Sequence, residues 1–504
     1  MSCGECRGPS NEEGRRCAPF LVFRTDHHSY VYDGAINQIF RVTPDAARLA
    51  DSFYRGEHGQ EALVEELGAQ AHGEAVRLLS SLRERTGVLT FRVPERVVAD
   101  QVSAEDARDR LYSLVLNVTE SCNLRCGYCV YGGAYPSKRA HGTSRMSWET
   151  AKAAIDYVAD HSAKSTFAER LLGWYGGEPF LNFDVIKRSS AYFRERFKDY
   201  RIKFSITSNA VCWSEEMIDF LVANDVELTV SLDGEAEDHD AQRRNVGGGG
   251  THAEVCENLV RLQRRSERYF RSKLNINAVI SKDTDLARLN RYFRSFPARV
   301  SISTVEPRDL SEASLLPVRL TGWQEMRVLF QEGCQKRAFD SPQFKEMGYN
   351  FVYYLFIREM ERIHRRQPAS GFPAILPALG CCQPGMERIF VTCNGEIETC
   401  EKTDGSLGLR LGNLQQGAID NERRTDIFDA LNGMDFPDCR LCFNVRFCSI
   451  CFAHALHNGE LVPRKRRWNC DNLRRKSAEM LSFYCEVLEN DPHAFDFIDE
   501  KLGT

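Results

Sequence analysis

An alternation of strand-length apolar runs with amphipathic segments, over residues 110–310, constrains the fold of this chain more than any other feature. Helical segments such as 148–161 and 214–224 separate the apolar runs. Strands that alternate with helices form a parallel sheet, because a parallel connection needs a crossover that a helix supplies. We expect an α/β fold in which six parallel strands close partly into a TIM-like (β/α)6 barrel, at residues 112–118, 171–175, 202–207, 227–232, 274–280 and 300–305.

The composition narrows the class of protein. With 504 residues and 42% hydrophobic content, the chain is long enough for several domains. Its 66 basic and 71 acidic residues nearly balance, which argues against a nucleic-acid partner. No apolar stretch reaches the ~20 residues of a membrane-spanning helix, and the N-terminus lacks the apolar segment of a secretory signal. We therefore expect a cytoplasmic protein with no nucleic-acid or membrane partner.

The 19 cysteines gather in groups along the chain. Three lie at Cys122, Cys126 and Cys129, eight fall in the range 381–451, and Cys470 follows. In a short secreted chain such numbers would predict disulfides, but the length and the grouping here favour metal binding.

The first group has the spacing C-x3-C-x2-C and comes directly after the first expected barrel strand. Three thiolates can bind three irons of a [4Fe–4S] cube and leave the fourth iron open to another molecule. Four thiolates would instead favour an electron carrier. A zinc knuckle or three buried thiols are the alternatives for this motif.

Polar motifs follow several of the other expected strands. Gly176-Gly177-Glu178-Pro179 comes after the second strand, Asn209 after the third, Ser231 at the fourth and Arg243 a short way beyond. Catalytic groups in such barrels lie at the carboxyl ends of the strands, so we expect these side chains to share one face. The two glycines permit a close backbone approach, Glu178 can accept from an ammonium group, and Arg243 suits a carboxylate.

The triplet, with Tyr128 before its last cysteine, and the Gly-Gly-Glu-Pro motif resemble those of radical SAM enzymes. The resemblance implies a [4Fe–4S] cluster on the three cysteines, whose open iron binds S-adenosylmethionine (SAM). Reductive cleavage of SAM would then release a 5′-deoxyadenosyl radical. The resemblance also implies a set of SAM contacts, namely Tyr128, Gly176, Gly177, Glu178, Asn209, Ser231 and Arg243. Asp233-Gly234 is equally typical of an ordinary turn.

The cysteines of residues 376–475 include the pattern Cys439-x2-Cys442-x5-Cys448-x2-Cys451, which resembles the SPASM extension of radical SAM enzymes that modify peptides and proteins. That extension carries two auxiliary [4Fe–4S] clusters. The resemblance implies a distal cluster on Cys439, Cys442, Cys448 and Cys470, and a proximal cluster on Cys382, Cys400 and Cys451. Zinc ribbons are the alternative for such C-x2-C pairs.

The proximal set lacks a cysteine at a place where sulfatase-maturing enzymes have one, because Arg388 stands there. Either Cys393 or Cys381 completes the set, or one iron stays open and binds a substrate thiolate. Glu401 follows Cys400, where those enzymes carry a catalytic acid. We expect Glu401 to act as a base, with an exposed, ion-paired glutamate as the alternative.

The N-terminal region has a pattern of short strands followed by helices. It resembles the small winged-helix domains that bind the leader segment of a precursor peptide by adding it to a sheet edge. A structural extension without a binding role is the alternative. The expected strands are 20–23, 30–32, 36–42 and 87–91, with a helix start at Thr43-Pro44 and further helical stretches at 60–68 and 73–85.

The sequence therefore predicts six units: a disordered tail at 1–17, a leader-peptide recognition domain at 18–98, a radical SAM barrel at 108–310, a helical connector at 311–375, a SPASM domain at 376–475 and a C-terminal helix at 476–504.

On these resemblances we expect a radical SAM enzyme that forms sulfur-to-carbon thioether crosslinks in a ribosomally made, Cys-rich precursor peptide. Its partners would be that peptide, with its leader, and a one-electron reductant such as flavodoxin or ferredoxin. Carbon–carbon crosslinking, or formylglycine formation as in sulfatase maturation, is the first alternative. A peptide-binding iron–sulfur electron-transfer protein that does not cleave SAM is the second.

Overall fold

A computed structural model describes most of residues 19–500. The tail expected at residues 1–17 lies outside the described residues. So do residues 56–59, 91–93, 99–108, 136–137, 306–316, 378–381, 404, 406, 417, 433–436, 450, 452, 454–455, 458–459 and 462–469.

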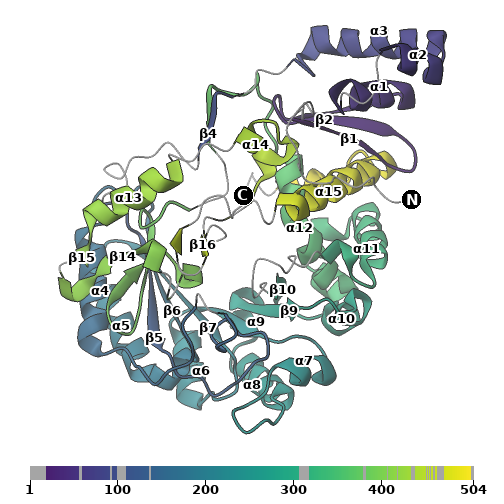
Figure 1. The fold of residues 1–504 in the computed structure, drawn as a ribbon. Helices are drawn as coiled ribbons and strands as arrows, with labels where there is room; N and C mark the ends of the chain where they lie inside the picture. Colours follow the sequence, from purple (N-terminus) through teal and green to yellow (C-terminus); the bar gives the residue numbers. More distant parts are fainter. Residues whose placement is uncertain are drawn as a thin grey trace.

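A curved sheet with six parallel strands lies in the lower half of the molecule as drawn in Figure 1. Its strands β5 to β10 pair in chain order, each parallel to the next. All six lie within two residues of the strands expected from the sequence, so the parallel α/β architecture is confirmed. The strands are Ser113–Thr119 (β5), Glu169–Gly176 (β6), Arg201–Ser208 (β7), Glu227–Ser231 (β8), Leu274–Ile280 (β9) and Arg299–Thr304 (β10).

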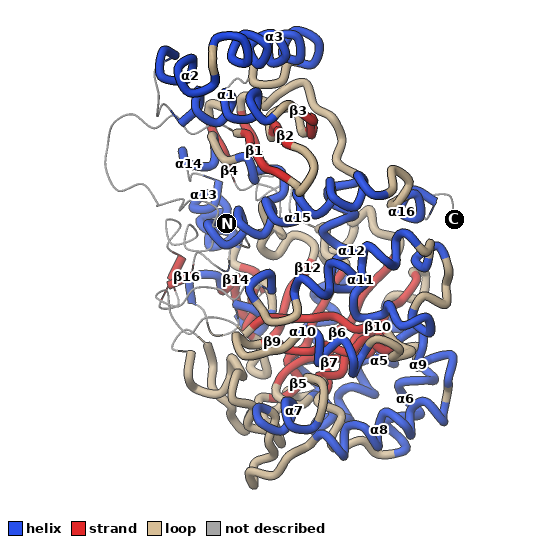
Figure 2. The backbone as a smooth tube through the Cα atoms, turned by 90° about the vertical axis from the view of Figure 1, so that its right-hand side faces the viewer, coloured by secondary structure: helices blue, strands red, loops and turns tan. Residues whose placement is uncertain are grey.

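The two faces of this sheet differ in polarity, because side chains alternate along a strand. Leu114, Leu116 and Val118 of β5 belong to the main hydrophobic core. On the other side, the Ser303 hydroxyl donates to Asn277 Oδ1 at 2.8 Å between β10 and β9. Helices lie around the outside of the strands (Figure 2). They are Trp148–Asp160 (α4), Phe183–Arg196 (α5), Glu215–Ala223 (α6), Ala236–Gln242 (α7), His252–Arg265 (α8), Glu267–Lys273 (α9) and Leu286–Phe293 (α10).

The sheet continues beyond β5 into the cysteine-rich part of the chain. β12 (Arg388–Val391) pairs parallel to β5. β13 (Glu396–Glu398), β14 (Arg410–Asn413) and β15 (Ala418–Ile419) follow in antiparallel order. The barrel strands and the cysteine-rich region therefore share one ten-stranded sheet.

The N-terminal unit has a small core of its own, which includes Val31, Val42 and Ala75. Its three antiparallel strands pair in the order β1-β2-β3, and three helices follow them, as the sequence predicts. The helices lie beyond one face of this small sheet (Figure 1). The elements are Phe20–Arg24 (β1), Ser29–Asp33 (β2), Gln38–Val42 (β3), Pro44–Arg55 (α1), Gln60–Leu67 (α2) and Ala69–Thr86 (α3).

The sequence predicts a strand at residues 87–91, and this prediction is wrong. Residues 87–90, the part of this range that the structure describes, form a turn. Gly87 ends α3 with a left-handed φ of 73°, and its N–H donates to Arg83 O. Leu89 also has a positive φ, 60°. The Leu89 N–H donates to Asp33 Oδ2 at 2.8 Å. The helix cap and the buried Asp33 carboxylate therefore hold a turn where the apolar sequence predicts a strand.

Helices pack between the N-terminal unit and the large sheet (Figure 2). Phe330, Phe356 and Phe483 join three of them, with ring centroids 5.1 to 5.9 Å apart. The C-terminal helix begins at Cys470, earlier than the expected residue 476. No helix in the described part of the chain is long and apolar enough to cross a membrane. The remaining elements are Arg96–Val98 (β4), Trp323–Gln335 (α11), Asn350–His364 (α12), Ile375–Pro377 (β11), Asn421–Asn432 (α13), Pro437–Arg440 (α14), Leu456–His457 (β16), Glu460–Leu461 (β17), Cys470–Asn490 (α15) and Asp496–Glu500 (α16).

Candidate functional site at the carboxyl edge of the sheet

The cysteine triplet lies on the loop that leaves the carboxyl end of β5. Cys122, Cys126 and Cys129 are partly buried, and none of them forms a disulfide. The Cys129 N–H donates to Cys126 O at 3.1 Å and closes a turn. Burial raises the pKa of all three thiols, that of Cys122 to about 12, and neighbouring thiols raise the pKa of Cys122 and Cys126 further. The sulfurs therefore interact with one another, and a bound cation would favour their ionised form.

The segment after α7 holds this loop in place through its backbone. The Arg125 N–H donates to Arg244 O at 2.8 Å, and the Gly127 N–H donates to Gln242 O at 2.9 Å. These bonds join two loops that are distant in sequence. They place Arg243 beside the cysteines.

Gly176 and Gly177 fit closely against the start of the cysteine loop. A Cβ atom on Gly177 would lie 2.1 Å from Ser121 O, and one on Gly176 would lie 2.2 Å from Thr119 O. The Gly177 N–H also donates to Thr119 O at 2.8 Å. No side chain fits at these distances, so the glycines seat the cysteine loop on the sheet. Their direct contact with SAM stays a prediction.

Glu178 and Asn209 belong to a chain of polar contacts that leads to the first cysteine. Glu178 is buried, and its carboxylate accepts from the Ser208 hydroxyl at 2.9 Å and from the Asn209 N–H at 2.7 Å. The Asn209 Nδ2 donates to Asn123 Oδ1 at 2.8 Å and lies 3.8 Å from Cys122 Sγ. Burial raises the pKa of Glu178 to about 7, although its donors oppose that shift.

Tyr128, Asp233 and Arg243 form a second buried polar group at the same edge. The Tyr128 hydroxyl donates to Asp233 Oδ2 at 2.6 Å and accepts from Arg243 Nη1 at 2.8 Å. Burial opposes the charge of Arg243, but Tyr128, Cys126 and Asp233 together keep its pKa above the usual range. The Arg243 Nε is buried and has no hydrogen-bond partner among the described residues. A fixed guanidinium with a spare donor suits a carboxylate ligand.

Asp233 and His239 were not among the expected site residues, yet they organise this group. Asp233 Oδ1 accepts from the Val279 N–H at 2.9 Å, and the Asp233 N–H donates to His239 Nδ1 at 3.3 Å. The Thr251 hydroxyl donates to Arg243 O at 2.8 Å and lies 3.1 Å from His239 Nε2. The available sequence signal was their position between the end of β8 and Arg243.

The remaining SAM contact expected from the sequence, Ser231, ends β8 and lies opposite Asn277 of β9. The donor set at this edge fits the predicted cluster and SAM: three thiols, a buried carboxylate and a guanidinium with a spare N–H. Within the described residues, no three His, Cys, Asp or Glu side chains gather as they would around one metal ion. In a [4Fe–4S] cube each thiolate would bind a different iron.

Glu401 and Cys400 lie where the cysteine-rich region meets the loop after the triplet. Glu401 Oε2 is 3.0 Å from Arg388 Nη2, and Glu401 O accepts from the Tyr131 hydroxyl at 3.1 Å. Burial raises the pKa of the Cys400 thiol, Glu401 raises it further, and Arg388 lowers it. Arg388 therefore faces both a carboxylate and a predicted ligand. The role of Glu401 as a base stays a prediction.

The other cysteines of the proximal set differ in exposure. Cys382 is exposed and Cys451 is partly buried. The Cys393 thiol is buried and donates to Asn117 O of β5 at 3.0 Å. A thiol in this position packs as a small core side chain, which does not favour Cys393 as a ligand. Cys381 lies outside the described residues, so the completion of this set stays a prediction.

The expected distal ligands lie on the loop that contains Cys439, Cys442 and Cys448 and at the start of α15, and Arg474 of α15 interacts with Cys442. The Cys442 N–H donates to Cys439 O at 3.2 Å. Burial raises the pKa of the Cys442 thiol, Cys448 raises it further, and Arg474 lowers it. Arg474 also interacts with Cys470, the first residue of α15. Two of the four expected thiols, Cys442 and Cys470, therefore interact with one guanidinium, which suits ligands that must be thiolates.

Residues 116–285 match the family model of the radical SAM superfamily. The match contains the cysteine triplet, Glu178 and Arg243, together with β6 to β9. The parallel sheet, the triplet and this match define the region as a radical SAM domain.

Relatives of known sequence match a limited part of the chain. An uncharacterized protein of Methanocaldococcus jannaschii is 32% identical over 128 residues, which are 25% of this chain and 40% of that protein. A cysteine-type anaerobic sulfatase-maturating enzyme of Clostridium novyi is 24% identical over 189 residues, 36% of this chain and 48% of the enzyme. The chain thus spans less than half the length of these curated relatives.

A solved structure shares the fold over a longer stretch. The structure of anSMEcpe with bound AdoMet and Cp18Cys peptide is similar with a TM-score of 0.53 and 18% sequence identity. The similarity covers 77% of this chain and 99% of that one. It shows that the common fold extends well beyond the matched radical SAM region.

Proposed function

We propose that this protein is a radical SAM enzyme that forms thioether crosslinks in a ribosomally made, Cys-rich precursor peptide. The observation that carries the proposal is the triplet of interacting thiols next to the buried Glu178 and Arg243, inside the matched radical SAM region. A second cysteine-rich region on the same sheet supports an enzyme with auxiliary clusters.

Cys122, Cys126 and Cys129 would hold the SAM-binding [4Fe–4S] cluster. When bound, the cluster and SAM would supply a 5′-deoxyadenosyl radical for hydrogen abstraction, and the auxiliary clusters an acceptor for the second electron. Glu178 keeps lone pairs for an ammonium group while its protein donors fix its orientation. Arg243 would bind the SAM carboxylate through its spare Nε–H.

Thioether formation replaces one S–H and one C–H bond by one S–C bond. The peptide therefore loses two hydrogen atoms in each crosslink, and the thiol proton needs an acceptor. Glu401 directly follows Cys400 in the sequence, and its carboxylate is ion-paired with Arg388. The carboxylate would accept the thiol proton once the substrate competes with Arg388 for it. An open iron of the proximal set would lower the pKa of the substrate thiol.

The N-terminal unit would recruit the leader of the peptide. β3 pairs with β2 on one side, and none of the other described strands pairs with its free side. A strand with one unpaired edge can accept an extended peptide as an added strand. A one-electron reductant such as flavodoxin or ferredoxin would start each turnover.

Formylglycine formation is the second candidate, because a relative is named as a sulfatase-maturating enzyme and Glu401 follows Cys400. Arg388 stands where sulfatase-maturing enzymes have a cysteine, and this departure favours the thioether outcome. Its ion pair with Glu401 bears equally on both reactions, because each would use that carboxylate.

The test is anaerobic incubation of the reconstituted protein with SAM, a reductant and the Cys-rich peptide encoded next to its gene. Mass spectrometry follows after disulfide reduction and thiol alkylation. We expect 5′-deoxyadenosine and a peptide that has lost two hydrogens for every thiol protected from alkylation. The Cys126→Ala variant should form neither product.

Each of the other outcomes shows which part of the proposed function is wrong. If 5′-deoxyadenosine forms but the peptide mass is unchanged, the radical chemistry holds and the substrate is wrong. A carbonyl-reactive product would indicate formylglycine. A wild-type protein with a full iron content that forms no 5′-deoxyadenosine would favour an electron-transfer protein.

A further inference from the structure

The N-terminal unit contacts the rest of the protein through elements that carry the expected distal cysteines. The first contact comes from Arg446, which lies between Cys442 and Cys448. Its Nε donates to Gly34 O at 2.7 Å, and its Nη2 donates to Ala35 O at 2.9 Å. One side chain therefore holds the turn between β2 and β3.

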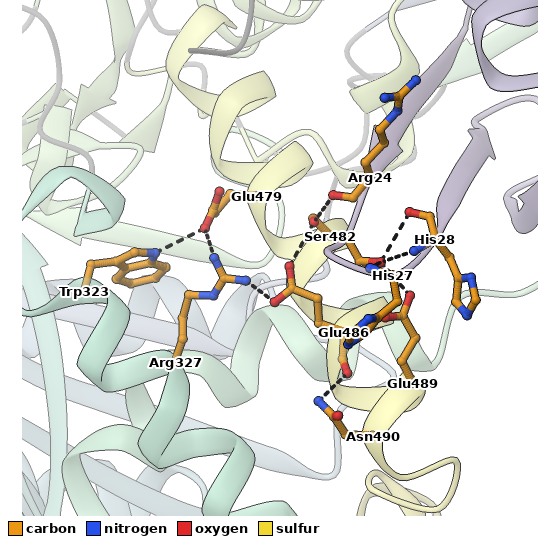
Figure 3. Close-up of polar contacts among 11 residues, drawn as sticks. Arg24, His27, His28, Trp323, Arg327, Glu479, Ser482, Glu486, Glu489 and Asn490 are labelled. Atoms are coloured by element: carbon orange, nitrogen blue, oxygen red, sulfur yellow. Dashed lines mark hydrogen bonds and ion pairs between the residues drawn. The ribbon is translucent and has the colours of Figure 1, made fainter. Parts of the chain in front are cut away.

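The second contact comes from α15, the helix that begins at Cys470 (Figure 3). The Ser482 hydroxyl donates to Arg24 O at 2.9 Å. Both Thr25 and Tyr30 donate through their hydroxyls to Glu489 Oε1, each at 2.7 Å. These bonds hold the β1–β2 hairpin.

The same helix is also fixed to the connector. Glu479 accepts from Arg327 Nη1 at 2.8 Å, and Glu486 forms a further ion pair with the same guanidinium (Figure 3). Arg327 belongs to α11 and is largely buried. α15 is therefore a rigid support between the connector and the hairpin.

Apolar packing also joins the β1–β3 sheet to the cysteine-rich loop. Tyr32 and Phe447 have ring centroids 5.4 Å apart, and a Cβ atom on Gly34 would lie 2.7 Å from Phe443 O. Tyr30 and Tyr32 belong to the main core, whereas Val31 between them belongs to the small N-terminal core. One face of the β1–β3 sheet is therefore built against the cysteine-rich loop and α15.

We propose that loading of the distal iron–sulfur site fixes the position of the N-terminal unit, and that Arg446 is the positioning residue that connects them. The cysteine loop and α15 are separate segments of the chain, and a cluster on Cys439, Cys442, Cys448 and Cys470 would join them. Metal binding that joins two segments removes their independent motion. By linkage, docking of the N-terminal unit would also favour loading of the site.

The coupling is partial, because the connector holds the same turn independently. Asn37 Nδ2 donates to Gln367 O at 2.9 Å, and the Ala369 N–H donates to Ile36 O at 2.9 Å. Loss of the distal cluster should therefore loosen the N-terminal unit without releasing it. The inference rests on the proposed distal cluster and needs no substrate.

The test is hydrogen exchange of the full chain, with iron content measured on the same samples. The reporter is the amide of Ala35, whose N–H donates to Asp33 Oδ1 at 2.8 Å within the held turn. In the Cys442→Ala variant we expect exchange at Ala35 to be about tenfold faster than in the loaded wild type. The matched control is Cys126→Ala, which removes a ligand of the other cluster and should leave this amide unchanged.

A second pair of variants separates docking from loading. Arg446→Ala should still load distal iron, with the weaker affinity that linkage implies, but show fast exchange at Ala35. Removal of iron by a chelator should then change that exchange little. Arg446→Lys retains one donor and should restore part of the protection. A purely structural role of Arg446 would leave the effect of the chelator as large as in the wild type.

Equal exchange at Ala35 in the loaded wild type, Cys442→Ala and Arg446→Ala would overturn the inference. Absence of distal iron from the reconstituted wild type would also overturn it. In that case the error would lie in the distal cluster on which the inference rests, while the SAM-cleavage activity would test the proposed function separately.

Discussion

At the scale of single residues, Arg243 is the side chain whose environment most clearly calls for a ligand. It is buried, bonded to Tyr128 through one nitrogen and unpartnered at Nε among the described residues. We predict that Arg243→Ala lowers the affinity for SAM by about tenfold or more, the cost of one lost charged hydrogen bond. Isothermal titration of the reconstituted protein measures this.

The neighbouring Arg244 supplies the control for that prediction. It is exposed and its Nε donates to Asp240 O at 2.9 Å, within its own segment. Arg244→Ala should bind SAM as the wild type does. The same loss in both variants, with normal iron content, would contradict the assignment of Arg243 to the SAM carboxylate.

His239 gives a prediction for pH dependence. Burial, with Arg243 and His252 nearby, lowers its pKa from 6.5 to about 3 in the folded protein. The unfolded chain therefore binds a proton at this position as the pH falls below about 6.5, and the folded protein does not. We predict that stability is lost progressively as the pH falls from about 6.5 toward 3.

Urea unfolding of the metal-free protein at a series of pH values measures this loss. The His239→Gln variant cannot titrate, so its midpoint should fall less steeply with pH, even where it is lower at neutral pH. Parallel curves for the two proteins would show that His239 does not contribute to the acid sensitivity.

At the scale of elements, the glycines after β6 fix the cysteine loop on the sheet. A Cβ atom on Gly177 would lie 2.1 Å from Ser121 O, so Gly177→Ala must displace that backbone. We predict a loss of about 1–3 kcal/mol of stability and of the iron bound by the triplet. Thermal unfolding and iron analysis measure both effects.

Gly73 provides the matched control within a helix. A Cβ atom there would lie 3.6 Å from its nearest neighbour, the end of the Arg77 side chain, which is ordinary contact. Gly73→Ala should keep the iron and stabilise α3 by about 1 kcal/mol. Iron loss in both variants would point to a general effect of substitution.

The elements also show what sequence patterns can and cannot predict. The six barrel strands were predicted because their apolar runs are local signals. The strand at 87–91 was wrong because Asp33, far away in sequence, holds Leu89 in a turn. The triplet, Glu178 and Arg243 were predicted to share one edge, and the structure brings them together there. The buried contacts of Asp233 with Tyr128 and His239 were missed, because no local pattern distinguishes such an aspartate from a turn residue.

At the scale of the whole molecule, the shared sheet makes the cysteine-rich region part of the barrel. β12 pairs with β5 across more than 260 residues of sequence, and no local pattern could indicate that pairing. We predict that a chain ended after residue 377 is insoluble, because β5 becomes an open, apolar edge strand. Size-exclusion chromatography of the expressed chain measures this.

The full-length Cys400→Ala variant separates the effect of losing β12 from the effect of losing a predicted metal ligand. It retains β12 but lacks a predicted proximal ligand, so we expect it to be soluble. A soluble, monomeric truncated chain would show that the radical SAM region forms a stable barrel without β12.

The partial burial of the cysteines affects how the folded chain reacts with oxidants before metal is bound. Burial raises the pKa of the thiols of Cys122, Cys126, Cys129, Cys400 and Cys442, which belong to three expected sites. Oxidation and thiol exchange proceed through the thiolate, which is scarce at such sites. We therefore expect oxidation of these five thiols to be slow in the folded chain before iron and sulfide are bound.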